Sequence, residues 1–294
     1  MKITVNNEVR EIDAPIRVKE LIEDPKKEKI VAKVNNRLRE LSYRFFYDAE
    51  VEFITLDDPE AVHVYEASLR YLVAMAFHHI YPKYKIKFKY SISRSVFCYV
   101  TNYNITNMED VLKNVQAEME RIVNLDLEFE RTTYTNEDAI SFHNKHENFD
   151  KLALLEYRPE KNVHFYKCDG YMNYMYSYMV ASSGYLKQYI LKPYEIGFLI
   201  QYPRSETSGE IPSFKNAPKY IETLRKASEW AEIIDANYIT KLNHQVESNS
   251  IVDFVGMSEA KHNAMLTEIG DLIKDNQDIR LIAIAGPSSS GKTT

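Results

Sequence analysis

The last sixteen residues, IRLIAIAGPSSSGKTT, restrict the possible fold of this chain more than any other stretch. The apolar run is typical of a buried parallel strand, and the loop after it matches the pattern G-x-x-x-x-G-K-[ST]. The glycines of such a loop let successive backbone N–H groups converge on phosphate oxygens. We therefore predict a strand followed by a nucleotide-binding loop, which together begin an α/β domain.

Within this loop, Lys292 is expected to contact the β- and γ-phosphates of ATP, and the Thr293 hydroxyl is expected to hold Mg²⁺. The helix that completes such a site would follow Thr294, as would a metal-binding aspartate and the catalytic residues. The chain by itself is therefore predicted to be inactive and to hold no tightly bound cofactor. The expected ATP-binding residues are Gly286, Ser288, Ser289, Ser290, Gly291, Lys292, Thr293 and Thr294.

Composition limits the classes of partner. The length of 294 residues suggests two or three domains, and the formal net charge is -6. No run of like charges gives the clustered basic surface that nucleic acids prefer, so tRNA binding is possible but disfavoured. Cys98 and Cys168 are too few for a disulfide framework, which indicates a cytoplasmic setting. We expect neither a signal peptide nor a membrane helix.

The N-terminal region, residues 1–58, is predicted to be a small β-grasp domain. KITV and VREI form a hairpin across Asn6-Asn7, VKELIED a short helix, and IVAKVN and EVEFITL two further strands. Any other small α+β module remains an alternative.

Residues 59–216 are predicted to form one α+β domain. Asp58-Pro59-Glu60 combines an N-cap residue, proline at the first helical position and an early acid, so a helix should begin there and end at Ile80. YKIKFKYSI alternates as a strand, and Thr106-x-x-Glu109 is a capping box that opens a second helix. Further strands are expected around LEFERTTY, NVHFYKC and YEIGFLIQYP.

The region of residues 217–278 is predicted to be helical. KYIETLRKASEWAEII and MSEAKHNAMLTEIGDLI are amphipathic, and a third helix is expected between them, around Tyr238 to Glu247. The remaining residues, 279–294, would be the strand and phosphate-binding loop of a truncated kinase domain.

The stretch RLIAIAGPSSSGKTT resembles the phosphate-binding loop of uridine kinases and their phosphoribulokinase relatives. VDFVGMSEAKHNAMLTEIGDLI resembles the helical segment that precedes it in a bacterial family with a long N-terminal extension. This resemblance implies an ATP-dependent nucleoside kinase that phosphorylates the 5′-hydroxyl of a nucleoside such as uridine. Residues 1–215 would then regulate or localise the kinase.

The extension itself resembles the N-terminal half of threonyl-tRNA synthetase, through EASLRYLVAMAFHHIYP, NVQAEMERIVNLDLEFERTTYTNEDAISFH and VHFYKCDGY. The resemblance implies a TGS domain followed by the second additional domain, which carries editing in many synthetases. Its His-x-x-x-His and Cys-x-x-x-His residues correspond here to Tyr71, Met75, Cys168 and Met172. Because tyrosine and methionine are neither general bases nor good zinc ligands, we expect these four to converge without binding zinc or hydrolysing seryl-tRNA.

Other residues carry weaker signals. His164-x-x-x-Cys168 and His143-x-x-His146 have too few partners for a metal site, and the second pair is expected in a solvated turn. GYMNYMYSYMVASSGY suits a buried sheet or the interface of a homo-oligomer better than a base-stacking platform. Two functions follow: part of a nucleoside kinase, or a catalytically dead synthetase-like module that binds tRNA or a small ligand.

Overall fold

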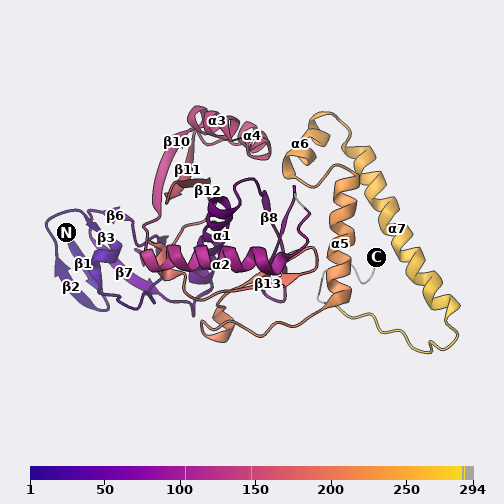
Figure 1. Ribbon diagram of the computed structural model, residues 1–294, viewed down its shortest axis with the longest axis horizontal. Helices are drawn as coiled ribbons and strands as arrows, with labels where there is room; N and C mark the ends of the chain where they lie inside the picture. The colour runs from indigo at the N-terminus through magenta and orange to yellow at the C-terminus, as the bar shows by residue number, and fades with distance from the viewer. Residues whose placement is uncertain (103, 147, 287, 289–294) are drawn as a thin grey trace. The chain divides into compact units, whose positions relative to one another are not determined.

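The structure is a computed structural model that describes residues 1–102, 104–146, 148–286 and 288. It divides into two compact units, Met1–Glu222 and Thr223–Thr294 (Figure 1). The first unit mixes helices with several sheets, which confirms the predicted α+β class. Within the described residues, no helix is both long enough and apolar enough to cross a membrane.

The first unit begins with a five-stranded sheet in the order β2-β1-β7-β4-β5. Its strands are β1 (Lys2–Val5), β2 (Glu8–Glu11), β4 (Val31–Val34), β5 (Arg37–Arg39) and β7 (Ala49–Ile54). β1 pairs with β2 through the predicted hairpin, where Asn6 and Asn7 both adopt positive φ, as a type I′ turn requires. β1 also runs parallel to β7. A small separate ladder joins β3 (Ile16–Arg17) to β6 (Arg44–Phe45).

The structure has a shorter helical segment than was predicted over VKELIED. Only a single 3₁₀ turn, η1 (Val18–Leu21), forms there, and Ile22 is already extended. Pro25 contributes to this early end because it disfavours helical backbone in the residue before it. Val18 and Leu21 still bury their side chains in the core of the N-terminal sheet.

Two long helices form the centre of the first unit: α1 (Pro59–Ile80) and α2 (Met108–Leu125). The side chain of Asp58 caps α1 by accepting a hydrogen bond from the Glu60 N–H at 2.7 Å, as predicted. The cap of α2 is Asn107, which accepts from the Asp110 N–H at 3.3 Å, so the expected cap at Thr106 is wrong by one residue. Asparagine is an equally good N-cap, which is why the pattern alone misplaced it.

Two further sheets surround these helices (Figure 1). One has the order β13-β14-β9-β8, and the other has the order β10-β11-β12 with α3 and α4 packed beside it. The strands and helices of this part of the chain are β8 (Ile86–Ile92), β9 (Ser95–Val100), β10 (Glu130–Thr135), α3 (Asn136–Lys145), α4 (Phe149–Glu156), β11 (Asn162–Cys168), β12 (Tyr171–Tyr174), β13 (Ile190–Tyr194) and β14 (Gly197–Gln201). Two 3₁₀ turns, η2 (Ser183–Tyr185) and η3 (Ser205–Thr207), lie in the connecting segments.

α1 lies in the middle of the largest core. Its side chains Leu69, Leu72 and Ala76 have no exposed surface, and Phe77 stacks on Phe198 of β14 with ring centroids 5.5 Å apart. Each fully buried side chain of the larger kind contributes roughly 1.5–3 kcal/mol. This packing holds α1 rigidly, so its polar side chains are well placed to position neighbouring loops.

The second unit contains most of α5 (Pro218–Ile233), together with α6 (Ile239–Glu247) and α7 (Ile251–Asp275). The three predicted helices are therefore present. Lys261 of α7 lies over the Trp230 ring of α5, with its Nζ 5.8 Å from the ring centroid.

The strand predicted over IRLIAIA is not formed: residues 279–286 have no regular structure, and 88% of Leu281 is exposed. A parallel strand of this composition is stable only when neighbouring strands and helices bury it. The apolar pattern alone was therefore insufficient evidence for a strand.

Candidate functional site

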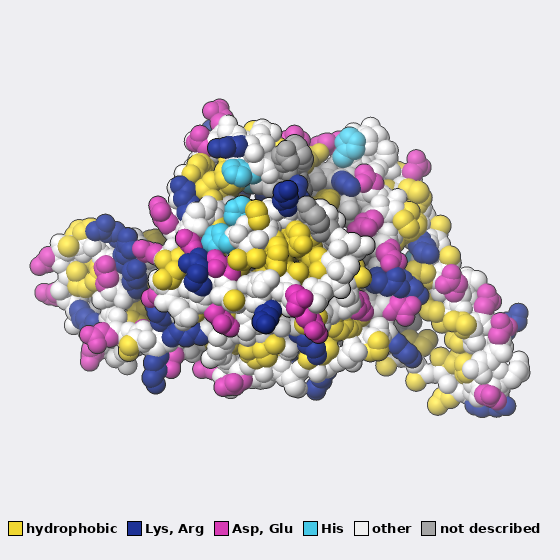
Figure 2. All heavy atoms as spheres, viewed as in Figure 1, with side chains coloured by type: hydrophobic (Ala, Val, Ile, Leu, Met, Phe, Trp, Pro, Cys, Tyr) yellow, Lys and Arg dark blue, Asp and Glu magenta, His cyan; other side chains and the backbone are white. Residues whose placement is uncertain are grey.

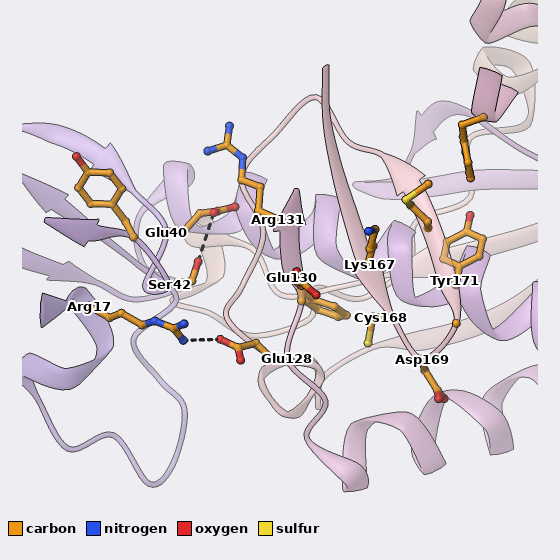
Figure 3. Close-up of a pocket in the computed structure, with 15 residues that line it drawn as sticks. Arg17, Glu40, Ser42, Glu128, Glu130, Arg131, Lys167, Cys168, Asp169 and Tyr171 are labelled. Carbon is orange, nitrogen blue, oxygen red and sulfur yellow. Dashed lines mark hydrogen bonds and ion pairs between the residues drawn. The ribbon is translucent and has the colours of Figure 1, made fainter. Parts of the chain in front are cut away.

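The first unit contains an open pocket of about 910 Å³ (Figure 3). One wall comes from β3 and from the loop between β5 and β6, through Arg17, Glu40 and Tyr43. The other wall comes from the start of β10 and from the β11–β12 hairpin, including Cys168 and Tyr171. The pocket is therefore built by segments that lie far apart in the sequence.

Glu40 is the most buried acid of this pocket, with 4% of its surface exposed. Its carboxylate accepts hydrogen bonds from the Tyr166 hydroxyl of β11, from the Met179 N–H at 2.9 Å and from the Ser42 hydroxyl at 3.4 Å. Burial raises the pKa of Glu40, although these hydrogen bonds oppose the rise. Glu40 thus links the loop after β5 to Tyr166 of β11 and to Met179, and its carboxylate is already occupied by donors of the protein.

Tyr71 of α1 supports the hairpin that lines the pocket. Its hydroxyl lies 2.9 Å from the main-chain oxygen of Tyr166 and 3.0 Å from that of Tyr171. Its ring packs edge-on against Phe129 and Tyr171, with centroids 5.4 and 5.1 Å away. Burial raises the pKa of this phenol well above its usual range. Tyr71 is therefore a neutral donor that holds the backbone of the hairpin.

The other predicted pocket residues are divided between two cores. Met75 and Cys168 share one buried cluster with Tyr71. Met172 instead packs in a different cluster with Phe165 and the residues of α3, because neighbouring residues of β12 point to opposite faces of the sheet. Three of the four side chains therefore share a core, and the fourth lies in another layer.

The Cys168 thiol shows no sign of activation. Burial, and to a smaller extent the neighbouring Asp169 carboxylate, raises its pKa to about 12. A thiol becomes a nucleophile or a metal ligand through its thiolate, which cations or helix N-termini stabilise. Cys168 is therefore a protonated core residue at neutral pH.

A polar network fixes the turn between β11 and β12. His79 of α1 places Nδ1 2.7 Å from a Glu118 oxygen and Nε2 3.0 Å from the Asp169 main-chain oxygen. Within the described residues, His79, Glu118 and Asp169 form a group that could offer three ligand atoms to a metal. Arg121, however, contacts both carboxylates, at 2.8 Å and 2.7 Å, so its guanidinium already supplies the cation. Sequence reasoning did not identify this network, because its members come from three separate segments.

The remaining sequence candidates do not join this pocket. His143 was expected in a solvated turn, but it lies in α3 and only 2% of its surface is exposed. It packs against Phe165 of β11, because α3 lies beside the β10-β11-β12 sheet. The His164 Nδ1 lies 3.0 Å from the Thr133 hydroxyl. Of the predicted phosphate-binding residues only Gly286 and Ser288 are described. Ser289, Ser290, Gly291, Lys292, Thr293 and Thr294 lie outside the described residues, so ATP and Mg²⁺ binding there stays a prediction.

Comparison with known proteins shows two similarities. The profile of the Bsp6I restriction endonuclease family matches residues 50–189. The threonine–tRNA ligase of Carboxydothermus hydrogenoformans is 30% identical over 191 residues, which cover 63% of this chain and 30% of the ligase. That of Fusobacterium nucleatum subsp. nucleatum is 32% identical over 168 residues, which cover 56% of this chain and 27% of the ligase.

These findings correct the functional prediction. The relatives are threonine–tRNA ligases, so the assignment of the chain to an ATP-dependent uridine or nucleoside kinase is wrong. The kinase resemblance was based mainly on a nine-residue motif, GPSSSGKTT, whereas the ligase similarity extends over 191 residues. The matched part spans about 30% of the length of these ligases. The chain is homologous to a part of threonyl-tRNA synthetases.

Proposed function

We propose that residues 1–222 form a synthetase-like recognition module that binds the 3′ end of a tRNA and does not hydrolyse the ester it carries. The similarity to threonine–tRNA ligases supports the choice of tRNA. We further infer a TGS-like β-grasp domain in residues 1–58, an editing-like domain in residues 59–216 and a helical segment in residues 217–278. The sheet order β2-β1-β7-β4-β5, with parallel β1 and β7, supports the first of these.

The observation that carries this proposal is the hydrogen bonding of Tyr71. Its hydroxyl donates toward two main-chain oxygens of the hairpin, so it stabilises the pocket wall, and because burial keeps this phenol neutral it does not act as a general base. Cys168 remains protonated, and the Glu40 carboxylate is occupied by donors of the protein. Hydrolysis therefore lacks a suitable general base among these three residues, while the pocket itself persists.

The pocket offers groups that suit a nucleotide. Arg131 and Lys167 line it together with the rings of Phe129 and Tyr171, and cations beside aromatic rings favour phosphates and bases. No ion pair among the described residues involves Arg131, whose guanidinium lies over the Tyr178 ring at 5.6 Å. Arg17, in contrast, is paired with Glu128 at 3.0 Å. Arg131 is therefore the residue that we assign to the phosphate contact.

Fluorescence anisotropy with labelled tRNA tests the binding. Arg131→Ala should weaken it about tenfold, the value of one charge-assisted hydrogen bond of roughly 1.5 kcal/mol. The matched control is Arg225→Ala, an exposed arginine of α5 in the second unit that pairs only with Glu229 among the described ion pairs. Equal binding by both variants, or no binding of tRNA by the unchanged protein, would contradict the proposal.

A separate assay tests the absence of hydrolysis. Deacylation of seryl-tRNA should proceed at the rate of the buffer alone. A faster rate that Cys168→Ala abolishes would show an active editing site and would contradict this half of the proposal.

A further inference from the structure

The first unit contains a second cavity, of about 350 Å³, which the proposed function does not use. Its lining comes from the segments 26–30 and 55–57, from α1, and from the segments 185–188 and 208–209. None of its described lining residues belongs to the pocket described above. This volume lies at the lower end of the range of roughly 300–1,000 Å³ for ligand pockets, so a small molecule would fit.

Hydrogen bonds and close packing fix the walls of this second cavity. The Tyr65 hydroxyl of α1 donates to the Gln188 main-chain oxygen at 3.0 Å and accepts a hydrogen bond from the Gln188 N–H at 2.9 Å. Gly209 has a φ of +78°, and a β-carbon at this position would lie 3.3 Å from the Leu56 Cβ, so the turn packs directly on the segment after β7. Because these walls are fixed before a ligand arrives, little ordering opposes binding.

Charged side chains of both signs line the second cavity without pairing with one another. Among the residues that the structure describes, Lys26, Lys187 and Glu28 form no ion pair and no side-chain hydrogen bond, and all three are exposed. The Asp57 carboxylate accepts a hydrogen bond from the Thr55 hydroxyl at 3.1 Å and forms no ion pair within the described part of the chain. Two cations and two carboxylates are therefore available to a ligand.

Apolar side chains distinguish the second cavity from an ordinary charged surface. Basic and acidic side chains are intermixed over the face of the molecule seen in Figure 2, so mixed charge alone does not indicate a site. Ile30, Leu56 and Tyr65 also line this cavity, and Ile30 and Tyr65 are each only 1% exposed. The charges therefore lie around apolar groups against which an apolar part of a ligand would be shielded from water.

We propose that the second cavity binds a free α-amino acid with an apolar side chain. The carboxylate of the amino acid would contact Lys26 and Lys187 through charge-assisted hydrogen bonds, and its side chain would pack on Leu56. Its ammonium group would contact Glu28 and Asp57 in the same way. A ligand with only one charge would leave either the lysines or the carboxylates of the cavity without a partner, so the cavity favours a zwitterion.

Isothermal titration calorimetry of the full chain tests this proposal with L-leucine and two analogues that each lack one charge. The analogue 4-methylpentanoate keeps the carboxylate and the side chain, and 3-methylbutylamine keeps the ammonium group and the side chain. Each should bind at least about tenfold more weakly than L-leucine, because it loses charge-assisted hydrogen bonds. Equal binding of either analogue, no binding of L-leucine, or tighter binding of L-aspartate or L-lysine would overturn the inference.

Two variants assign the charges of the ligand to the residues of the second cavity. Lys187→Ala should weaken L-leucine binding about tenfold and leave 3-methylbutylamine binding unchanged, because the amine has no carboxylate. Asp57→Asn should weaken L-leucine binding and leave 4-methylpentanoate binding unchanged. The matched control is Lys161→Ala, an exposed lysine outside the cavity, and an equal loss in this variant would contradict the proposal. Arg131→Ala should also keep L-leucine binding, so a failure of the tRNA pocket and a failure of the second cavity give different results.

Discussion

The hydroxyl of Tyr71 should stabilise the first unit measurably, because it joins α1 to the β11–β12 hairpin. Tyr71→Phe removes only this oxygen and keeps the ring that packs between Phe129 and Tyr171. Phenylalanine retains nearly all of the apolar contact area, so the expected change in stability comes from the lost hydrogen bonds alone.

The size of the effect follows from the burial of the site. Tyr71 is 1% exposed, and its hydroxyl lies within 3.0 Å of two main-chain oxygens that water reaches poorly. Loss of a buried hydrogen bond, together with a carbonyl left under-satisfied, costs about 2 kcal/mol. For a unit of this size, that corresponds to a fall in Tm of about 4–8 °C.

Thermal unfolding followed by circular dichroism measures this change. Tyr176→Phe is the matched control, since Tyr176 is 94% exposed and its hydroxyl should contribute almost nothing. A Tyr71→Phe variant whose Tm stays within about 1 °C of the unchanged protein would refute the assignment of a structural role to the hydroxyl.

Three further predictions concern Glu40, Cys168 and the N-cap of α1. Because burial raises the pKa of Glu40 above its ordinary 4.5, the folded state holds this proton more tightly, and the associated stability is lost as pH rises through the raised pKa. Glu40→Gln should therefore gain stability relative to the unchanged protein between pH 4.5 and pH 8 in urea unfolding, and parallel curves would contradict this. Cys168, with its pKa near 12, should react with a thiol reagent at neutral pH only after unfolding, and rapid labelling of the folded protein would show otherwise. Asp58→Ala should lower the free energy of unfolding by about 1 kcal/mol through loss of the α1 cap, whereas Asp57→Ala should not.

The segment YKIKFKYSI is predicted to be a half-buried strand, and β8 confirms this prediction. The spacing of its residues does not show that Lys87 lies opposite Tyr99 of β9, because the pairing of the two strands decides which residues become neighbours.

Local patterns in the sequence by themselves determined where α1 begins and where the first hairpin turns. Asp58-Pro59 placed the start of α1, and Asn6-Asn7 placed the first hairpin, because caps and tight turns depend on a few neighbouring residues. The loop GPSSSGKTT misled for the related reason that a short motif carries no information about the domain around it.

Tertiary structure alone decided the site. Glu40 meets Tyr166 across 126 positions of sequence, and Tyr71 meets the Tyr171 backbone across 100. The register of β12 sends Met172 into a different core from Cys168, although the two are only four residues apart. Which face a strand residue occupies depends on pairing and burial against distant elements, and these interactions are invisible in the spacing of residues along the chain.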